Sequence, residues 1–217
     1  MKKVLNCRSF IKNNESILDV ERKYTHIRAY HGCSTNDVES YYKYGIVPIE
    51  VEFAKSQALE KFVDEWTSVD TVLGVFDKHW KEFDQVHRSV WFCVSRKELI
   101  QSCGHYLIYG SEFISGIAAE LYRLDMLKGK GKPTIFHCDV PIKQIPKYFF
   151  ESLKDNLKIG DLENCGFKIE NTLSTEEIIK YDNPDLVFDP LKGNRPYKYH
   201  NFINANAPKI ITVCESR

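Results

Sequence analysis

Alternating apolar and polar residues predict a strand near the start of the chain, followed by a turn and a short helix. Residues 26–33 have the sequence His-Ile-Arg-Ala-Tyr-His-Gly-Cys, and alternate residues from Ile27 to Cys33 share one face of a strand. The polar residues 34–37 then supply N-cap side chains for a short helix. That helix is expected to end at Gly45, because glycine adopts the left-handed C-terminal conformation most easily.

The next segment has the pattern of helices. Over residues 50–66 the apolar positions recur every three or four residues, which predicts an amphipathic helix. A second helical stretch, rich in aromatic residues, covers 72–83. We expect these two helices to form a helical insertion over residues 50–85, placed as a cap on a sheet.

The second half of the chain contains both the alternating pattern of strands and the three- and four-residue spacing of helices. Residues 89–94 are a run of β-formers and predict the clearest strand, while Ser95 and Glu98 form a capping box that opens a helix. The remaining pattern predicts extended chain at 105–109, a helix at 114–124, a strand at 134–140, a helix at 145–157, irregular chain at 182–204 and a closing strand at 207–213. Together these elements predict a single α+β domain over residues 1–217.

Composition limits the kinds of partner. The chain has 217 residues, 43% of them hydrophobic and 28% charged, which is typical of one folded globular domain. Thirty basic residues balance thirty acidic ones, so no overall positive field attracts a phosphate backbone. Two small basic clusters, at 128–132 and 192–198, are expected to be solvated loops.

The cysteine pattern and the absence of long apolar runs limit which structural sites and which cellular location are expected. Seven cysteines occur without any CxxC pair, so we expect neither a disulfide framework nor a zinc ribbon. Cys103 and His105 offer only two metal ligands, and we expect no metal site. No segment approaches the roughly 18 apolar residues that span a bilayer. The expectation is a cytoplasmic protein with no membrane partner.

Two motifs resemble a known family. The segment Tyr30-His31-Gly32-Cys33-Ser34, the helix after it and residues 44–48 resemble the opening of diphtheria-toxin-type ADP-ribosyltransferases, the group that includes the poly(ADP-ribose) polymerases. Residues 90–95 look like the aromatic strand of that family, which ends in a small polar residue. The resemblance covers roughly residues 26–140 and implies an ADP-ribosyltransferase-like split mixed β-sheet with flanking helices.

The resemblance implies NAD as co-substrate. It implies that His31 hydrogen-bonds the adenosine ribose and that the backbone of Gly32 approaches the nicotinamide carboxamide. An aromatic ring stacks on nicotinamide, with Tyr44, Phe92, Tyr106 and Tyr109 as candidates. A carboxylate stabilises the oxocarbenium-like transition state, and Glu112 is the candidate. We therefore expect catalytic roles for His31, Tyr109 and Glu112, although the family normally places its glutamate on a late strand and residues 200–204 contain no acid.

Three functions remain open at this point. The first is mono-ADP-ribosyl transfer or NAD hydrolysis by a toxin or defence effector, with a protein, a nucleic acid or water as acceptor and an inhibitory protein as a further partner. The second is a binding module for NAD or ADP-ribose without turnover. The third is an NAD-dependent RNA 2′-phosphotransferase, which needs basic residues at its pocket, with Arg28, Arg88 and Arg96 as candidates. Arg28 falls on the opposite strand face from His31.

Each candidate also has a purely structural explanation. His31 can be a half-buried histidine of the core, and Glu112 can simply favour the first turn of a helix. Cys33 shares a strand face with His31 and could be a histidine-activated nucleophile, but a buried structural cysteine is expected. His137 and Asp139 alternate on a predicted strand and could join a site on one sheet face.

Overall fold

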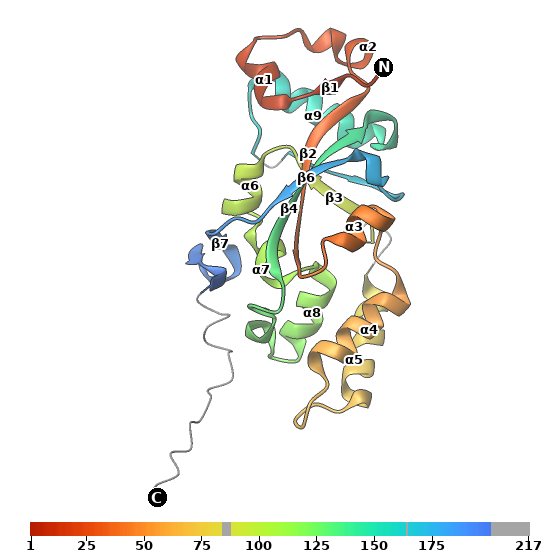
Figure 1. Cartoon of the computed structure of the whole chain (residues 1–217), viewed down its shortest axis with the longest axis vertical. Helices are drawn as coiled ribbons and strands as arrows, with labels where there is room; N and C mark the ends of the chain where they lie inside the picture. Colours follow the sequence, from red (N-terminus) through yellow and green to blue (C-terminus); the bar gives the residue numbers. More distant parts are fainter. Residues whose placement is uncertain (84–87, 164, 201–217) are drawn as a thin grey trace, which may run out of the picture.

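The protein has a mixed α+β fold built on one six-stranded sheet (Figure 1). The structure, a computed structural model, describes residues 1–83, 88–163 and 165–200. Within them the strands of the large sheet are β1 (Val4–Leu5), β2 (His26–Thr35), β3 (Val90–Cys93), β4 (Lys132–Pro141), β5 (Gly166–Ile169) and β6 (Ile178–Asp182). The strand order is β5-β3-β2-β4-β6, with β1 pairing with β2. The β1–β2 pair is parallel, whereas the other pairs are antiparallel.

Strand β2 organises the sheet. All ten of its residues, from His26 to Thr35, pair with β4, and Tyr30 also pairs with Cys93 of β3. Because side chains alternate along a strand, β2 serves two different layers. Ile27 and Ala29 lie buried on one face. A Cβ at Gly32, on the other face, would contact side chains of the second layer.

The first layer covers the face of Ile27 and Ala29. It contains α1 (Cys7–Lys12), α2 (Val20–Lys23), α3 (Glu39–Tyr44), α9 (Lys147–Ile159) and the short 3-10 helices η1 (Ile17–Asp19), η3 (Ile142–Gln144) and η4 (Thr175–Glu177). The first core includes Phe92, Phe136, Phe150 and Phe167. Figure 1 shows α1, α2 and α9 gathered at one end of the molecule, near the N-terminus.

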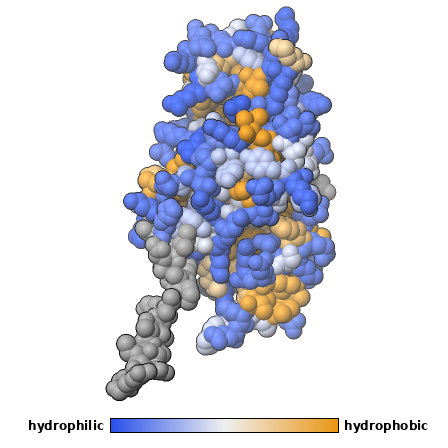
Figure 2. All heavy atoms as spheres, viewed as in Figure 1, coloured by the Kyte–Doolittle hydropathy of each residue, from blue (hydrophilic) through white to orange (hydrophobic). Residues whose placement is uncertain are grey.

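The second layer lies on the opposite face and toward the other end of the molecule. Its helices are α4 (Val51–Phe62), α5 (Val69–Glu82), α6 (Arg96–Gln101), α7 (Gly104–Tyr109), α8 (Glu112–Glu120) and η2 (Leu124–Leu127). The second core contains Phe62, Phe76, Leu107, Phe113 and Ile135. The helices expected as an insertion over 50–85 therefore share a core with the sheet. Figure 2 shows a largely hydrophilic surface in this view, with apolar side chains gathered near these helices.

Most predicted elements are confirmed by the structure. The strand at 26–33, the strand at 134–140 and the helices within 50–85 are present, and α3 ends at Gly45, whose φ is 83°. Ser95 caps α6, since its side chain accepts a hydrogen bond from the backbone N–H of Glu98. The local signals of period and capping were sufficient for these elements.

Other expectations were wrong. Residues 105–109 are not extended but form the helix α7, which buries Leu107, Ile108 and Tyr109 against the second core. A short apolar run does not distinguish a buried helix from a strand. The region expected to be irregular contains β7 (Val187–Asp189), η5 (Pro190–Lys192) and β8 (Arg195–Tyr197), with β7 and β8 paired in a small second sheet. The strands β1, β5 and β6 were not predicted.

Two expectations concern other parts of the chain. The closing strand expected at 207–213 lies outside the described residues. Across the ranges that the structure describes, none of the helices has the length and apolar character needed to cross a bilayer.

Candidate functional site

His31 lies on the first-layer face of β2 in a fixed orientation. Its Nδ1 donates a hydrogen bond to the carbonyl oxygen of Trp91, 3.0 Å away on the neighbouring strand. Its ring centroid is 5.8 Å from that of Phe92. Burial lowers the pKa of the His31 imidazole, and the bond to Trp91 only partly offsets this effect. The ring is therefore neutral near pH 7, with its proton on Nδ1 and Nε2 left as an acceptor.

Cys33 lies on the same strand face but has the properties of a structural thiol. Burial raises the pKa of Cys33 to about 12, so the thiolate needed for nucleophilic attack is scarce at neutral pH. Beside it, the ring of Tyr41 stacks on Phe136 with centroids 4.5 Å apart. The structure thus favours the buried structural cysteine over the histidine-activated nucleophile.

Tyr106 and Glu112 form a second group, in the second layer. The hydroxyl of Tyr106 donates to Oε1 of Glu112 at 2.5 Å, and Nε2 of His105 lies 3.9 Å from the same oxygen. Glu112 is in the first turn of α8, where the helix dipole favours an acid. A Cβ on Gly32 would meet Leu107 of α7 at 3.1 Å, so α7 faces Gly32.

The predicted residues are therefore divided between the two faces of the sheet. His31 and Phe92 lie together on the first-layer face, whereas Tyr106 and Glu112 lie together on the other. Tyr44 is 60% exposed, with the ammonium of Lys43 over its ring at 4.8 Å. The structure does not place Glu112 beside His31.

Tyr109 is buried in the second core and is hydrogen-bonded to Asp189, a residue that lines a cavity. Its hydroxyl donates to Oδ2 of Asp189 at 2.5 Å. The cavity has a volume of about 320 Å³ and is lined by Asp125, Lys128, Asp189, Lys192, Arg195, Pro196 and Tyr197. Its lining includes basic residues from both of the clusters at 128–132 and 192–198. Because Lys128 and Lys192 both contact the carboxylate of Asp125, at 2.9 and 3.6 Å, much of this positive charge is neutralised.

The second face of the sheet also carries a set of polar residues that we call the polar sheet face. Its members are Arg28, Tyr30, Arg96, His137, Asp139 and Asp182. Arg96 donates to both carboxylate oxygens of Asp182, at 2.5 and 3.1 Å, and His137 Nε2 donates to the same carboxylate at 2.6 Å. Burial raises the pKa of Asp182, but these two partners outweigh it and hold the pKa below its ordinary value. Asp182 is therefore ionised at neutral pH.

Tyr30 connects two ion pairs on the polar sheet face. Its ring contacts that of His137 edge-on, with centroids 5.0 Å apart. Nε of Arg28 donates to Oδ1 of Asp139 at 2.5 Å. Hydrogen bonds to their aspartates raise the pKa of both Arg28 and Arg96, and the nearby Tyr30 phenol adds to this shift. A single phenol thus lies near two guanidinium groups.

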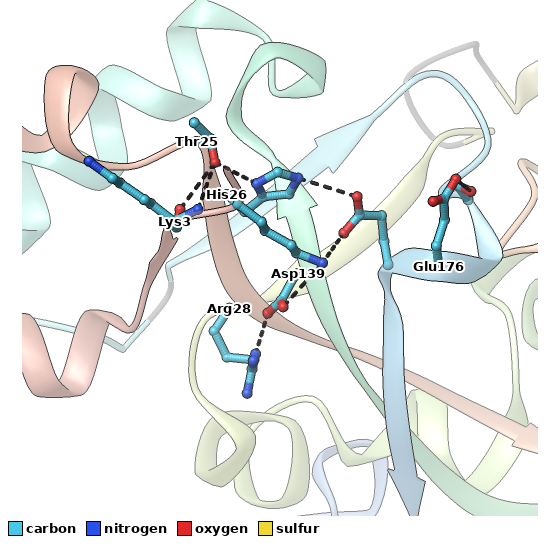
Figure 3. A network of polar contacts seen from close by, with 9 residues as sticks. Lys3, Thr25, His26, Arg28, Asp139 and Glu176 are labelled. Atoms are coloured by element: carbon cyan, nitrogen blue, oxygen red, sulfur yellow. Dashed lines mark hydrogen bonds and ion pairs between the residues drawn. The ribbon is translucent and has the colours of Figure 1, made fainter.

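A network at the end of this face includes a glutamate that the sequence interpretation missed (Figure 3). Oε1 of Glu177 lies 3.2 Å from His26 Nε2, and its Oε2 accepts from Lys2 Nζ at 2.5 Å. Lys2 also reaches Asp139, at 3.3 Å. Figure 3 shows Glu176 directed away from this network. Glu177 immediately precedes β6, a strand late in the chain. The two β-branched residues at 178–179 are the feature of the sequence that could have predicted this strand.

Comparison of the chain with protein-family models, with curated proteins and with solved structures finds no match. The relevant geometry is the His31–Phe92 pair, the Tyr106–Glu112 pair and the polar sheet face with the Glu177 network.

Proposed function

We propose that this chain is an NAD-dependent ADP-ribosyltransferase, which cleaves the nicotinamide glycosidic bond on an ADP-ribosyltransferase-like sheet. The observation that carries the proposal is the position of His31, held on a central strand against the neighbouring aromatic strand with its ring 5.8 Å from Phe92. The order of strand, turn, short helix and Gly45 stop agrees with the same resemblance.

The state of His31 suits binding of a ribose. Because Nδ1 donates to the Trp91 carbonyl, Nε2 is the atom that can accept a hydrogen bond from a ribose hydroxyl. Phe92 is only 2% exposed and stacks on Phe167, so its role in the proposal is to orient His31. Tyr106 lies on the sheet face opposite His31, so it could contact the nicotinamide ring only if NAD reaches that second face.

The carboxylate of the proposal is Glu177. It is the last residue of η4 and directly precedes the late strand β6, next to the kind of strand on which the resembled family carries its glutamate. Its side chain is 16% exposed and is oriented by His26 and Lys2. His31 is assigned to the adenosine ribose and the glutamate to the nicotinamide ribose. His31 and His26, the partner of Glu177, lie on opposite faces of β2, so the proposal requires NAD to reach both faces, and the tests below examine each residue separately.

The first test measures release of nicotinamide from NAD. We expect His31→Ala to lower this rate by more than tenfold, equivalent to more than about 1.4 kcal/mol of barrier. His79→Ala is the matched control, because His79 pairs with Glu120 on the surface of the second layer and should retain activity. A folded His31→Ala protein with unchanged turnover would remove His31 from the mechanism. NAD binding without nicotinamide release would instead support the binding module.

The second test separates the two glutamates. We expect Glu177→Gln to lower nicotinamide release by more than tenfold, because the amide cannot stabilise a developing cation as a carboxylate does. Glu112→Gln should stay within about twofold, since the amide can still hydrogen-bond to Tyr106. The opposite result would assign the catalytic carboxylate to Glu112. Labelled NAD with protein, DNA and RNA acceptors then distinguishes transfer from hydrolysis.

A second candidate is NAD-dependent removal of a 2′-phosphate from RNA. The specific observation in its favour is that Arg28 and Arg96 both lie on the polar sheet face, where a phosphate would compete with Asp139 and Asp182 for the two guanidinium groups. Arg88 does not contribute, because it donates to the carbonyls of Trp80 and Phe83 and lies over the Trp80 ring. Loss of phosphate from a 2′-phosphorylated oligonucleotide, abolished by Arg96→Gln, is the expected result for this function.

A further inference from the structure

Three potential metal ligands from separate elements meet on the second-layer side of the sheet. Cys93 ends β3, Glu98 lies in α6, and Cys103 is the N-cap residue of α7. The two sulfurs and a carboxylate oxygen all lie within 4.8 Å of one another. Cys93 pairs with Tyr30 across the sheet, so this group is on the face opposite His31.

The chemistry of this group matches a borderline-soft divalent cation. Zinc binds cysteine sulfur at about 2.3 Å and carboxylate oxygen at about 2.0–2.2 Å, which places tetrahedral ligands roughly 3.5–3.8 Å apart. The sulfurs of Cys93 and Cys103 lie within 4.8 Å of each other. Small side-chain rotations would therefore be enough to bring three ligands around one ion. Calcium and magnesium, which prefer an all-oxygen shell, do not suit two sulfurs.

Burial adds a reason for a cation at this place. Glu98 is only 7% exposed, and its carboxylate shares the site with Cys93 and Cys103. A positive charge close to a buried carboxylate stabilises it. A zinc ion would supply that charge and would hold both cysteines as thiolates.

We propose that Cys93, Glu98 and Cys103 form a zinc site that fastens the start of α7 and the helix α6 to the end of β3. Three protein ligands leave one tetrahedral position for solvent. The sequence predicts no metal site, because Cys93, Glu98 and Cys103 follow no recognised ligand spacing and only the fold brings them together. The proposal is independent of the proposed NAD chemistry.

The test measures zinc bound to the full chain purified with a reductant and then dialysed against zinc. We expect about one zinc per chain by elemental analysis. Cys103→Ser should lose most of this zinc yet still fold, because serine is itself a favourable N-cap residue. Glu98→Gln should bind zinc at least tenfold more weakly. Cys33→Ala is the control, as Cys33 is on the opposite sheet face, and it should retain the metal.

Two further measurements keep the proposal falsifiable. Cobalt added to the metal-free protein should produce thiolate-to-cobalt absorption in the wild type and in Cys33→Ala but not in Cys103→Ser. Zinc should also raise the melting temperature of the wild type and leave that of Cys103→Ser unchanged. The proposal is overturned by a zinc-free wild type after dialysis, by equal zinc in Cys103→Ser, or by a Cys93–Cys103 disulfide that persists in reductant.

Discussion

His31 illustrates how the surroundings of one side chain determine its chemistry. Burial against the first layer lowers the pKa of its imidazole, and the bond from Nδ1 to Trp91 selects one tautomer. A neutral ring with a free Nε2 acceptor suits a neutral hydroxyl better than a phosphate. The same burial that fits His31 for the proposed ribose contact also links it to folding stability.

A pH titration of stability tests the state of His31. Its folded pKa lies below the unfolded value of about 6.5, so the unfolded chain binds more protons as pH falls. The stabilising contribution is complete above pH 6.5 and is lost progressively below it. We expect the free energy of unfolding to decrease more between pH 7.5 and 5.5 in the wild type than in His31→Gln. Urea denaturation measures this, and equal decreases would contradict the assignment.

Helix α7 shows how a short element depends on its neighbours. Gly104 begins the helix at a point where β7 approaches closely. A Cβ built on Gly104 lies 2.0 Å from the carbonyl oxygen of Phe188 and 2.6 Å from Cγ1 of Val187. A glycine is required at position 104 because the nearby backbone of Phe188 leaves no room for a side chain. This contact ties the small second sheet to the second layer.

Two glycine substitutions with opposite expected effects test this close approach. Gly104→Ala should lower the free energy of unfolding by about 1–3 kcal/mol, because β7 or α7 must move to admit the methyl group. Gly74→Ala should instead raise it by about 0.5–1 kcal/mol. Gly74 is inside α5, and a Cβ there meets no atom within 4 Å. Chemical denaturation of both variants provides the measurement, and a neutral Gly104→Ala would show that the approach is looser.

The full fold consists of two cores that share one sheet. The first core lies under α1 and α9, and the second lies under α4, α5 and α8. Strands β2 and β4 contribute to both, since Ala29 and Phe136 face one core and Ile135 faces the other. The helices at 50–85 are therefore joined to the sheet through packing, so the two layers should unfold together.

Removal of one ring from the second core tests this coupling. Phe76 is 1% exposed and contacts Trp80 and Phe113, with ring centroids 5.7 and 5.2 Å away. We expect Phe76→Ala to lower the free energy of unfolding by about 3–5 kcal/mol. Tryptophan fluorescence and far-ultraviolet circular dichroism should still report one common transition. Separate transitions would mean that the insertion folds independently of the sheet.

Local features of the chain were sufficient to predict several elements. The alternation at 26–33, the three- and four-residue spacing at 50–66 and the cap at Ser95 each involve neighbours in sequence. Such features act through backbone geometry and short-range hydrogen bonds, so they need no knowledge of the rest of the fold. The globular composition and the mixed α+β class followed from the same information.

Long-range pairing determined the remainder. Residues 105–109 became helical because the second core buries them, and β6 exists because β4 offers an edge to it. Arg96 meets Asp182 across 86 positions of sequence, and Cys93 meets Cys103 through the turn of α6 into α7. Local sequence therefore established β2 with His31 and Gly32 on opposite faces. The packing of distant segments established which groups share each face, because contact free energy depends on neighbours in space.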